Sequence, residues 1–255
     1  MDGLFTLLSP TYFLIACSIA VLGGVVKGVV GFAMPMVLIS GLTTFIAPDV
    51  ALAGLIVPTL VTNLMQALRQ GPQEAWQSIQ RFRVFLVAMV ATLVMSAQLV
   101  PMISSRMLLL MIGVPVICFA LLQLSGKRFH LSRQTPLSEG LVGGFAGCVG
   151  GLSGVWGPPT VAYLTALRTE KYTQMRVQGV IYGVGAVALF GAHVTSGVLR
   201  AETLPLSIAL VPAAVLGMWM GTRILDRIDQ QMFGRATLIV LLVAGANLVR
   251  RGLLG

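Results

Sequence analysis

One lysine stands alone in an apolar run near the start of the chain. Lys27 is flanked by valines and glycines, and it is the only basic residue deep inside an apolar stretch. A lysine buried in hydrocarbon is costly and usually functional. Its position predicts either a counter-charge for an anion or a gate whose charge changes. The alternative is a lysine whose long stem reaches the water interface, and the sequence leaves both interpretations open.

Lys27 lies in a glycine- and proline-rich motif that recurs in the second half of the chain. Four residues keep the same mutual spacing in both copies: Gly24, Gly28, Gly31 and Pro35 in the first, and Gly147, Gly151, Gly154 and Pro158 in the second. Proline cannot continue a helix, but it suits the first turn of a new one. We therefore expect Pro35 to start a half-helix after an unwound stretch at Phe32–Met34. Pro158 should do the same after Val155–Gly157.

Broken helices of this kind can bind anions. Unsatisfied backbone is tolerated inside a membrane only where it faces protein or a water-filled cavity. The start of the second half-helix presents free amides and a positive dipole end, and paired breaks in two repeats are typical of transporter binding sites. Close helix packing is the alternative; it explains the glycines but not the prolines, whereas Gly217 and Gly221 are assigned to packing. The predicted substrate contacts at the motifs are Lys27, Gly28, Gly31, Phe32, Ala33, Met34, Pro35, Gly154, Val155, Trp156, Gly157 and Pro158.

Polar residues in two other apolar runs could complete the site. Thr59, Thr62, Asn63 and Gln66 share one helical face, and we expect Asn63 and Gln66 either to line the cavity or to bond between helices. Gln178 and Tyr182 lie four residues apart on one face and are also predicted to line the site. His193 could relay protons near neutral pH, although a lone histidine in a helix is more often structural. Trp156 could either pack or wall the site.

The elements that position these residues are membrane helices. Of the 255 residues, 56% are hydrophobic and only 10% are charged, so a lipid solvent is required. The apolar runs are Thr11–Ala47, Val50–Leu68, Phe82–Ile103, Met107–Leu124, Glu139–Leu167, Met175–Leu199, Thr203–Leu225 and Met232–Val249. The first and fifth are much longer than one span of about 20 residues. We therefore predict an all-α polytopic protein with 8 to 10 membrane segments.

The recurring motif predicts an internal duplication. The first membrane repeat is residues 1–125, residues 126–138 form a polar linker, and the second repeat is residues 139–255. If both long runs turn back at their motifs, most loop lysines and arginines fall on one side of the membrane. The other side keeps only Arg106, Arg200, Arg250 and Arg251. The positive-inside rule favours this arrangement, which makes the repeats inverted and places both termini in the periplasm.

Several classes of protein are disfavoured. The net charge of +9 lies mostly in loops, which suits anionic lipid rather than nucleic acid. No zinc-protease, serine-hydrolase or P-loop motif occurs, so we expect neither an enzyme nor a metal site nor a cofactor. The three cysteines are isolated, and acidic residues such as Asp49 and Glu139 lie at run ends, which argues against a cation transporter.

The chain resembles the TauE/SafE family, the sulfite exporter-like membrane permeases. The resemblance covers essentially the whole chain and rests on the segments 27–35 and 150–159, with Gly217, Gly221 and Arg223 before the last helix. It implies a multi-pass permease of the bacterial inner membrane that carries small anions, such as sulfite or organosulfonates, and sometimes carboxylates. Ala33, Met34 and Trp156 replace the consecutive glycines that are common in the family, which implies a differently shaped pocket.

Together these observations predict a secondary transporter whose two broken helices hold a small anion near the midplane of the lipid bilayer. Transport would either use protons or run as uniport. A passive anion channel of the same fold and a carboxylate transporter are the alternatives.

Overall fold

Helices make up all the regular structure of the described chain. A computed structural model describes residues 9–97, 105–126, 131, 133–153, 156–195 and 202–254. Within these ranges there are eleven helices and no strand, so the predicted all-α class is confirmed. The chain divides into two compact units: unit 1 is Met1–Arg69 with Gly179–Asp229, and unit 2 is Gln70–Gln178 with Gln230–Gly255.

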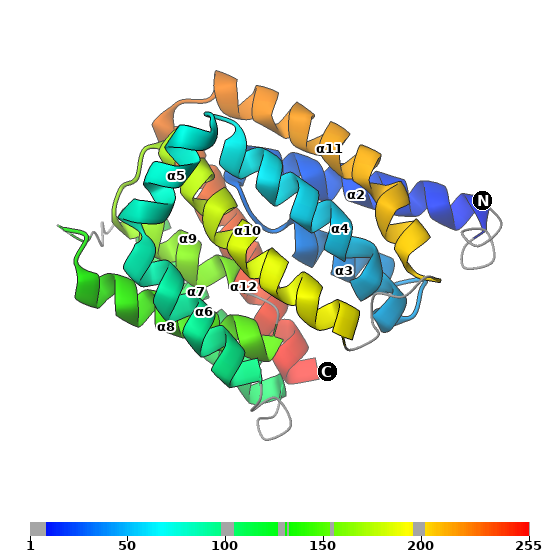
Figure 1. The fold of residues 1–255 in the computed structure, drawn as a ribbon, viewed down its shortest axis with the longest axis horizontal. Coiled ribbons are helices and arrows are strands. Elements are labelled where there is room, and N and C mark those ends of the chain that lie inside the picture. The colour runs from blue at the N-terminus through cyan, green and yellow to red at the C-terminus, as the bar shows by residue number, and fades with distance from the viewer. Residues whose placement is uncertain are drawn as a thin grey trace. The chain divides into compact units, whose positions relative to one another are not determined.

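Unit 1 is organised around two long helices that pack along each other, α2 (Pro10–Val30) and α11 (Leu204–Arg227). The pair is seen in blue and orange in Figure 1. The short α3 (Met34–Leu42) packs on α2, and α4 (Pro48–Leu68) packs on both α3 and α11. The C-terminal part of α10 (Lys171–Thr195) completes the unit.

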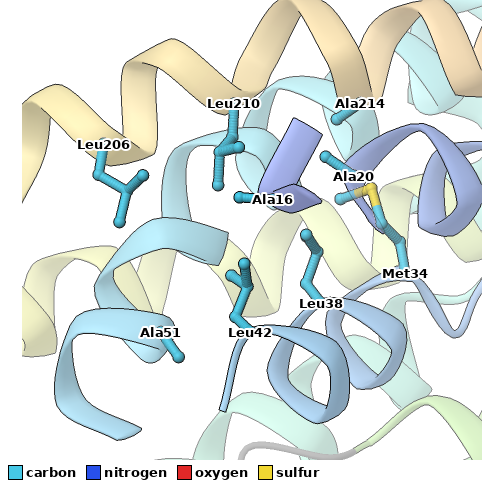
Figure 2. Packing of buried hydrophobic residues seen from close by; sticks show 9 residues of the cluster. All are labelled: Ala16, Ala20, Met34, Leu38, Leu42, Ala51, Leu206, Leu210 and Ala214. Carbon is cyan, nitrogen blue, oxygen red and sulfur yellow. The ribbon is translucent and has the colours of Figure 1, made fainter. Parts of the chain in front are cut away.

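The apolar core of unit 1 fixes the half-helix α3. Met34, Leu38 and Leu42 recur every fourth residue, so they lie on one face of α3, and all three are fully buried. Figure 2 shows them in one cluster with Leu206 and Leu210 of α11. Small residues complete the cluster: Ala16, Ala20, Ala51 and Ala214. This packing holds the N-terminal end of α3 at the point where α2 stops.

Glycines let α2 and α11 approach closely. A Cβ atom on Gly24 would lie 2.3 Å from the carbonyl oxygen of Ala214, and one on Gly217 would lie 2.1 Å from that of Val21. Gly28 and Gly221 face the opposite helix in the same way, 2.4 Å from the Met218 oxygen and 2.2 Å from the Val25 oxygen. The packing role predicted for Gly217 and Gly221 is therefore confirmed, and the same role accounts for Gly28.

Unit 2 contains a similar close pair. Its helices are α5 (Pro72–Arg81), α6 (Arg83–Ala97), α7 (Ser105–Leu124), α8 (Pro136–Ser153), α9 (Gly157–Ala166), the start of α10, and α12 (Gln230–Leu254). A Cβ atom on Gly147 of α8 would lie 2.0 Å from the carbonyl oxygen of Met89 of α6. The Thr92 hydroxyl of α6 donates to the carbonyl oxygen of Gly144 at 2.8 Å. α7 packs on α12, and α9 packs on α7, α8 and α12.

The third apolar run begins at a sharp bend. The axes of α5 and α6 differ by 75°, so the first amides of α6 have no preceding turn to bond to. The buried Glu139 of α8 supplies an acceptor for one of these amides. Its carboxylate accepts from the Phe85 amide at 3.4 Å and from the Gln134 side chain. Glu139 is thus a cap for a neighbouring helix.

The helices have the length and surface of a polytopic membrane protein. Four described helices are long and apolar enough to cross a bilayer, namely Pro10–Val30, Val50–Leu68, Leu204–Arg227 and Gln230–Leu254. The bent α5–α6 pair would make a fifth. Large apolar side chains such as Leu22 and Val243 are exposed on these helices, as expected where lipid is the solvent. The count of 8 to 10 segments stays a prediction.

The predicted repeats and the observed units are different divisions of the chain. Each unit takes helices from both predicted halves: α11 joins α2–α4 in unit 1, and α5–α7 join α8 and α9 in unit 2. The boundaries 1–125, 126–138 and 139–255 therefore stay a prediction.

Candidate anion site at the first helix break

The first break lies between α2 and α3. α2 ends at Val30, and α3 begins at Met34 with Pro35 in its first turn. Gly31 has φ 88° and Ala33 has φ 72°. The chain therefore passes through the left-handed conformation, which residues other than glycine rarely adopt. The unwound residues are 31–33 rather than the predicted Phe32–Met34. The shift arises because a proline is tolerated at any position of a first turn whose amides are unused.

Lys27 lies one turn before the break and does not reach an aqueous surface. Its relative exposure is 1%, which rules out the snorkelling alternative within unit 1. Its ammonium group donates to the side-chain oxygen of Asn63 on α4. No carboxylate of the described residues forms an ion pair with it. Lys27 is therefore a buried ammonium whose described partner is a neutral amide.

The polar face of α4 connects Lys27 with the break. The Asn63 amide nitrogen donates to the Tyr182 carbonyl oxygen at 3.1 Å, which turns the Asn63 oxygen toward Lys27. One turn further along, the Gln66 amide nitrogen donates to the Gly31 carbonyl oxygen at 3.1 Å. Gln66 thereby bonds to the residue that caps the C-terminal end of α2. Asn63 and Gln66 are both almost completely buried.

A proline and a serine shape α4 just before this polar face. Pro58 has no amide hydrogen, so the Gly54 carbonyl oxygen loses its helical donor. The buried Ser207 hydroxyl of α11 donates to that oxygen at 3.3 Å and accepts from the Val57 amide at 3.1 Å. Sequence reasoning missed Ser207, because Pro58 signals a free carbonyl but does not say which distant helix supplies the donor.

Two threonines share the polar face but differ in their bonding. The Thr62 hydroxyl donates back to the Pro58 carbonyl oxygen at 2.7 Å and lies 3.9 Å from the Met34 sulfur. The Thr59 hydroxyl is buried and has no hydrogen-bond partner among the residues that the structure describes. Most buried hydroxyls in helices bond to a carbonyl one turn back, so Thr59 is unusual. It lies one turn from Asn63 on the same face, and it is a free donor at the candidate site.

The second break lies in unit 2 and has a different content. α8 ends at Ser153 and α9 begins at Gly157, so Pro158 again lies in a first turn. Trp156 is buried, and a Cβ atom on Gly150 would lie 3.0 Å from its indole ring. The Thr160 hydroxyl donates to the Trp156 carbonyl oxygen at 2.9 Å. Gly154 and Val155 lie outside the described residues.

The remaining predicted residues fall into separate places. Tyr182 is buried in unit 1, where its backbone oxygen holds Asn63. Gln178 is buried at the end of unit 2. His193 lies in α10, but its side chain is outside the described residues. Among the described residues no group of three His, Cys, Asp or Glu residues could hold a metal ion.

Comparison with known proteins identifies the family. No curated protein and no solved structure matches the chain. The family model described as sulfite exporter TauE/SafE matches residues 16–248, which includes both helix breaks and the polar face of α4. The family is one of membrane transporters, in keeping with the long apolar helices. The chain therefore belongs to the sulfite exporter TauE/SafE family.

Proposed function

We propose that the protein is a secondary transporter of small anions, with sulfur oxyanions such as sulfite or organosulfonates as the expected substrates. We place the anion at the first break, beside the N-terminal end of α3. The observation that carries the proposal is the buried Lys27 ammonium, which has a neutral partner and lies one turn from the break. A buried cation of this kind is stabilised by an anionic ligand far more than by neutral amides.

The surrounding groups support a binding role for the break. Lys27 supplies charge, and the first amides of α3 add donors. Asn63 and Gln66 hold Lys27 and Gly31 in position, and Thr59 offers a free hydroxyl. The side chains of Lys27, Asn63 and Gln66 are almost completely buried. A low local dielectric strengthens each of these interactions with an anion.

A binding screen tests the proposal directly. Purified protein would be heated with sulfite, thiosulfate, sulfoacetate, taurine or small carboxylates, and its Tm recorded. At least one sulfur oxyanion should raise Tm in a concentration-dependent way, because a ligand that binds only the folded state stabilises it. Stabilisation by carboxylates alone would favour a carboxylate transporter. No stabilisation by any of these anions would contradict the proposal.

Flux measurements separate a carrier from a channel. Proteoliposomes loaded with the stabilising anion would be compared with and without an imposed proton gradient. A proton-coupled carrier accumulates anion against its gradient when the proton gradient is present, whereas a passive channel only equilibrates it. Uniport also equilibrates the anion, but it saturates with concentration and shows counterflow of labelled substrate.

We also propose that the chain is an inverted duplication with 8 to 10 membrane segments and with both termini in the periplasm of a bacterial inner membrane. Support comes from matching boundaries. α2 ends and α3 begins at the same spacing from the motif proline as α8 and α9 do. Further support comes from matching contacts, because Gly24 meets the Ala214 oxygen in unit 1 much as Gly147 meets the Met89 oxygen in unit 2.

Labelling of a single cysteine tests the orientation. The native thiols Cys17, Cys118 and Cys148 would be replaced by serine, and Arg250→Cys introduced near the end of α12. In intact spheroplasts an impermeant thiol reagent should label this cysteine, and Arg69→Cys should be labelled only after the membrane is opened. The reverse pattern would refute periplasmic termini without affecting the anion site.

A further inference from the structure

We infer that the first break binds anions with a single negative charge and discriminates against dianions of the same shape. The inference rests on the proposed function, because it specifies which anions the Lys27 site accepts. The inference depends on the charged groups that lie in unit 1.

Lys27 supplies the only full positive charge that is buried in the described residues. The other buried charged side chain is the carboxylate of Glu139, which belongs to unit 2. The described arginines of unit 1 are exposed: Arg69, Arg223 and Arg227. Arg69 pairs with Asp226 at 2.8 Å, and Arg223 lies over the Trp219 ring. None of these guanidinium groups is committed to the break.

The helix ends at the break add little net charge. The N-terminal end of α3 carries roughly half a positive elementary charge, and the C-terminal end of α2 carries roughly half a negative one. The two ends meet across residues 31–33, so their effects on a ligand there largely cancel. Pro35 also removes one donor from the first turn of α3. The net charge that a ligand meets is therefore close to that of Lys27 alone.

The neutral groups fix the number of available donors. The Asn63 amide nitrogen is bound to the Tyr182 oxygen, and the Gln66 amide nitrogen to the Gly31 oxygen. The Thr62 hydroxyl is bound to the Pro58 oxygen. The donors that a ligand can still meet are the ammonium group, with one of its three hydrogens used, the Thr59 hydroxyl, the second amide hydrogen of Asn63 and the first amides of α3. These donors suit two or three oxygens of one small oxyanion.

Charge balance then selects the ligand. In a buried site a monoanion and Lys27 form a neutral pair, whereas a dianion leaves one uncompensated negative charge away from water. Uncompensated charge in a low-dielectric region is expensive. A tetrahedral monoanion such as a sulfonate therefore meets the requirements of the site, and a dianion of equal size does not.

A matched pair of ligands tests the inference. Methanesulfonate and methylphosphonate have similar tetrahedral heads, but in mildly alkaline buffer the first carries one charge and the second carries two. Their affinities for the purified full-length protein would be measured by calorimetry and by the shift in Tm. We expect methanesulfonate to bind at least about tenfold more tightly, which corresponds to one step of about 1.4 kcal/mol.

Two controls separate charge from chemistry. The monomethyl ester of methylphosphonate keeps phosphorus but carries a single charge, so it should regain most of the lost affinity. Lys27→Met should abolish the preference along with binding. Methylphosphonate binding as tightly as methanesulfonate would overturn the inference and leave the proposed anion site intact. Failure of all three ligands to bind would overturn the inference, and the screen of sulfur oxyanions and carboxylates would decide the proposed function separately.

Discussion

The two helix breaks have the same helix boundaries relative to their motif prolines, but their side chains differ in charge and size. In unit 1 the break at residues 31–33 is accompanied by a long buried cation, and in unit 2 the break ends at a buried indole. When the motifs are aligned on Pro35 and Pro158, Gly150 stands where the first motif has Lys27, and Trp156 stands where it has Ala33. The first motif therefore carries a charged side chain, and the second carries a bulky apolar one.

This difference shows that two helix breaks with the same backbone boundaries need not serve the same function. Trp156 packs on Gly150, so the space above that glycine is filled by an apolar ring. Ala33 is small, and Lys27 extends instead to Asn63. The helices that follow differ in the same sense. Asn63 and Gln66 of α4 correspond to Ala186 and Leu189 in α10, when both helices are aligned from their first residues. Among the described residues, a buried cation with a polar side-chain partner lies at the first break, and a buried indole lies at the second.

Removing the indole should give the largest change in stability. Trp156→Ala deletes a buried ring packed on Gly150, and we expect the free energy of unfolding to fall by about 3–5 kcal/mol. The measurement is thermal or denaturant unfolding in detergent. Trp219→Ala is the matched control, because Trp219 is exposed on α11 and its loss should cost far less. If Trp156→Ala instead kept its stability and lost stabilisation by anions, Trp156 would be a wall of a binding site.

Removing the Lys27 cation should weaken anion binding without lowering the stability of the unliganded protein. Lys27→Met deletes a buried charge with a neutral partner, so unliganded stability should stay the same or rise. Anion affinity should fall by at least about thirtyfold, because truncating one partner of a buried charge pair costs about 2–5 kcal/mol. Calorimetric titration with the best anion of the screen measures this. Arg227→Met, which removes an exposed charge from the end of α11, should leave affinity unchanged. Equal affinities for Lys27→Met and wild type would refute the anion role.

Much of this contrast could be predicted from sequence, because it depends on local rules. Proline cannot continue a helix, so the sequence predicts the start of each second half-helix within one residue of its observed position. The isolated Lys27 stands out in the sequence because charge is rare in apolar runs. The partners of Lys27 could not be predicted in the same way. The sequence predicted a polar face on α4, but bonding to Asn63 depends on how α4 packs in unit 1. Ser207 and the pairing of α2 with α11 are also long-range, since a glycine stripe fits several partners equally well.

Removal of the hydrogen bond from Gln66 to the first break should lower stability by an intermediate amount, and the effect should be confined to unit 1. Gln66→Leu removes the donor to the Gly31 carbonyl oxygen, and the loss of this buried hydrogen bond should cost about 0.5–1.5 kcal/mol. Hydrogen exchange should therefore speed up at residues 31–34 and stay unchanged at residues 156–160 of unit 2. The second break is thus an internal control. Equal acceleration at both breaks would mean that the variant loosens the whole protein.

The smallest expected effect tests whether the free hydroxyl at the first break is a ligand donor. Thr59→Val replaces the hydroxyl by a methyl group of similar size, and it removes an unpartnered polar group from a buried position. Stability should therefore hold, while anion affinity should fall by about two- to tenfold, the usual range for one hydrogen bond. Thr237→Val makes the same chemical change at a buried, unpartnered hydroxyl of α12 in unit 2. Because Thr237 belongs to unit 2 and the proposed anion site to unit 1, its variant should bind the anion like wild type. Equal losses in both variants would mean that the effect comes from burial in general, and Thr59 would then have no special part in the site.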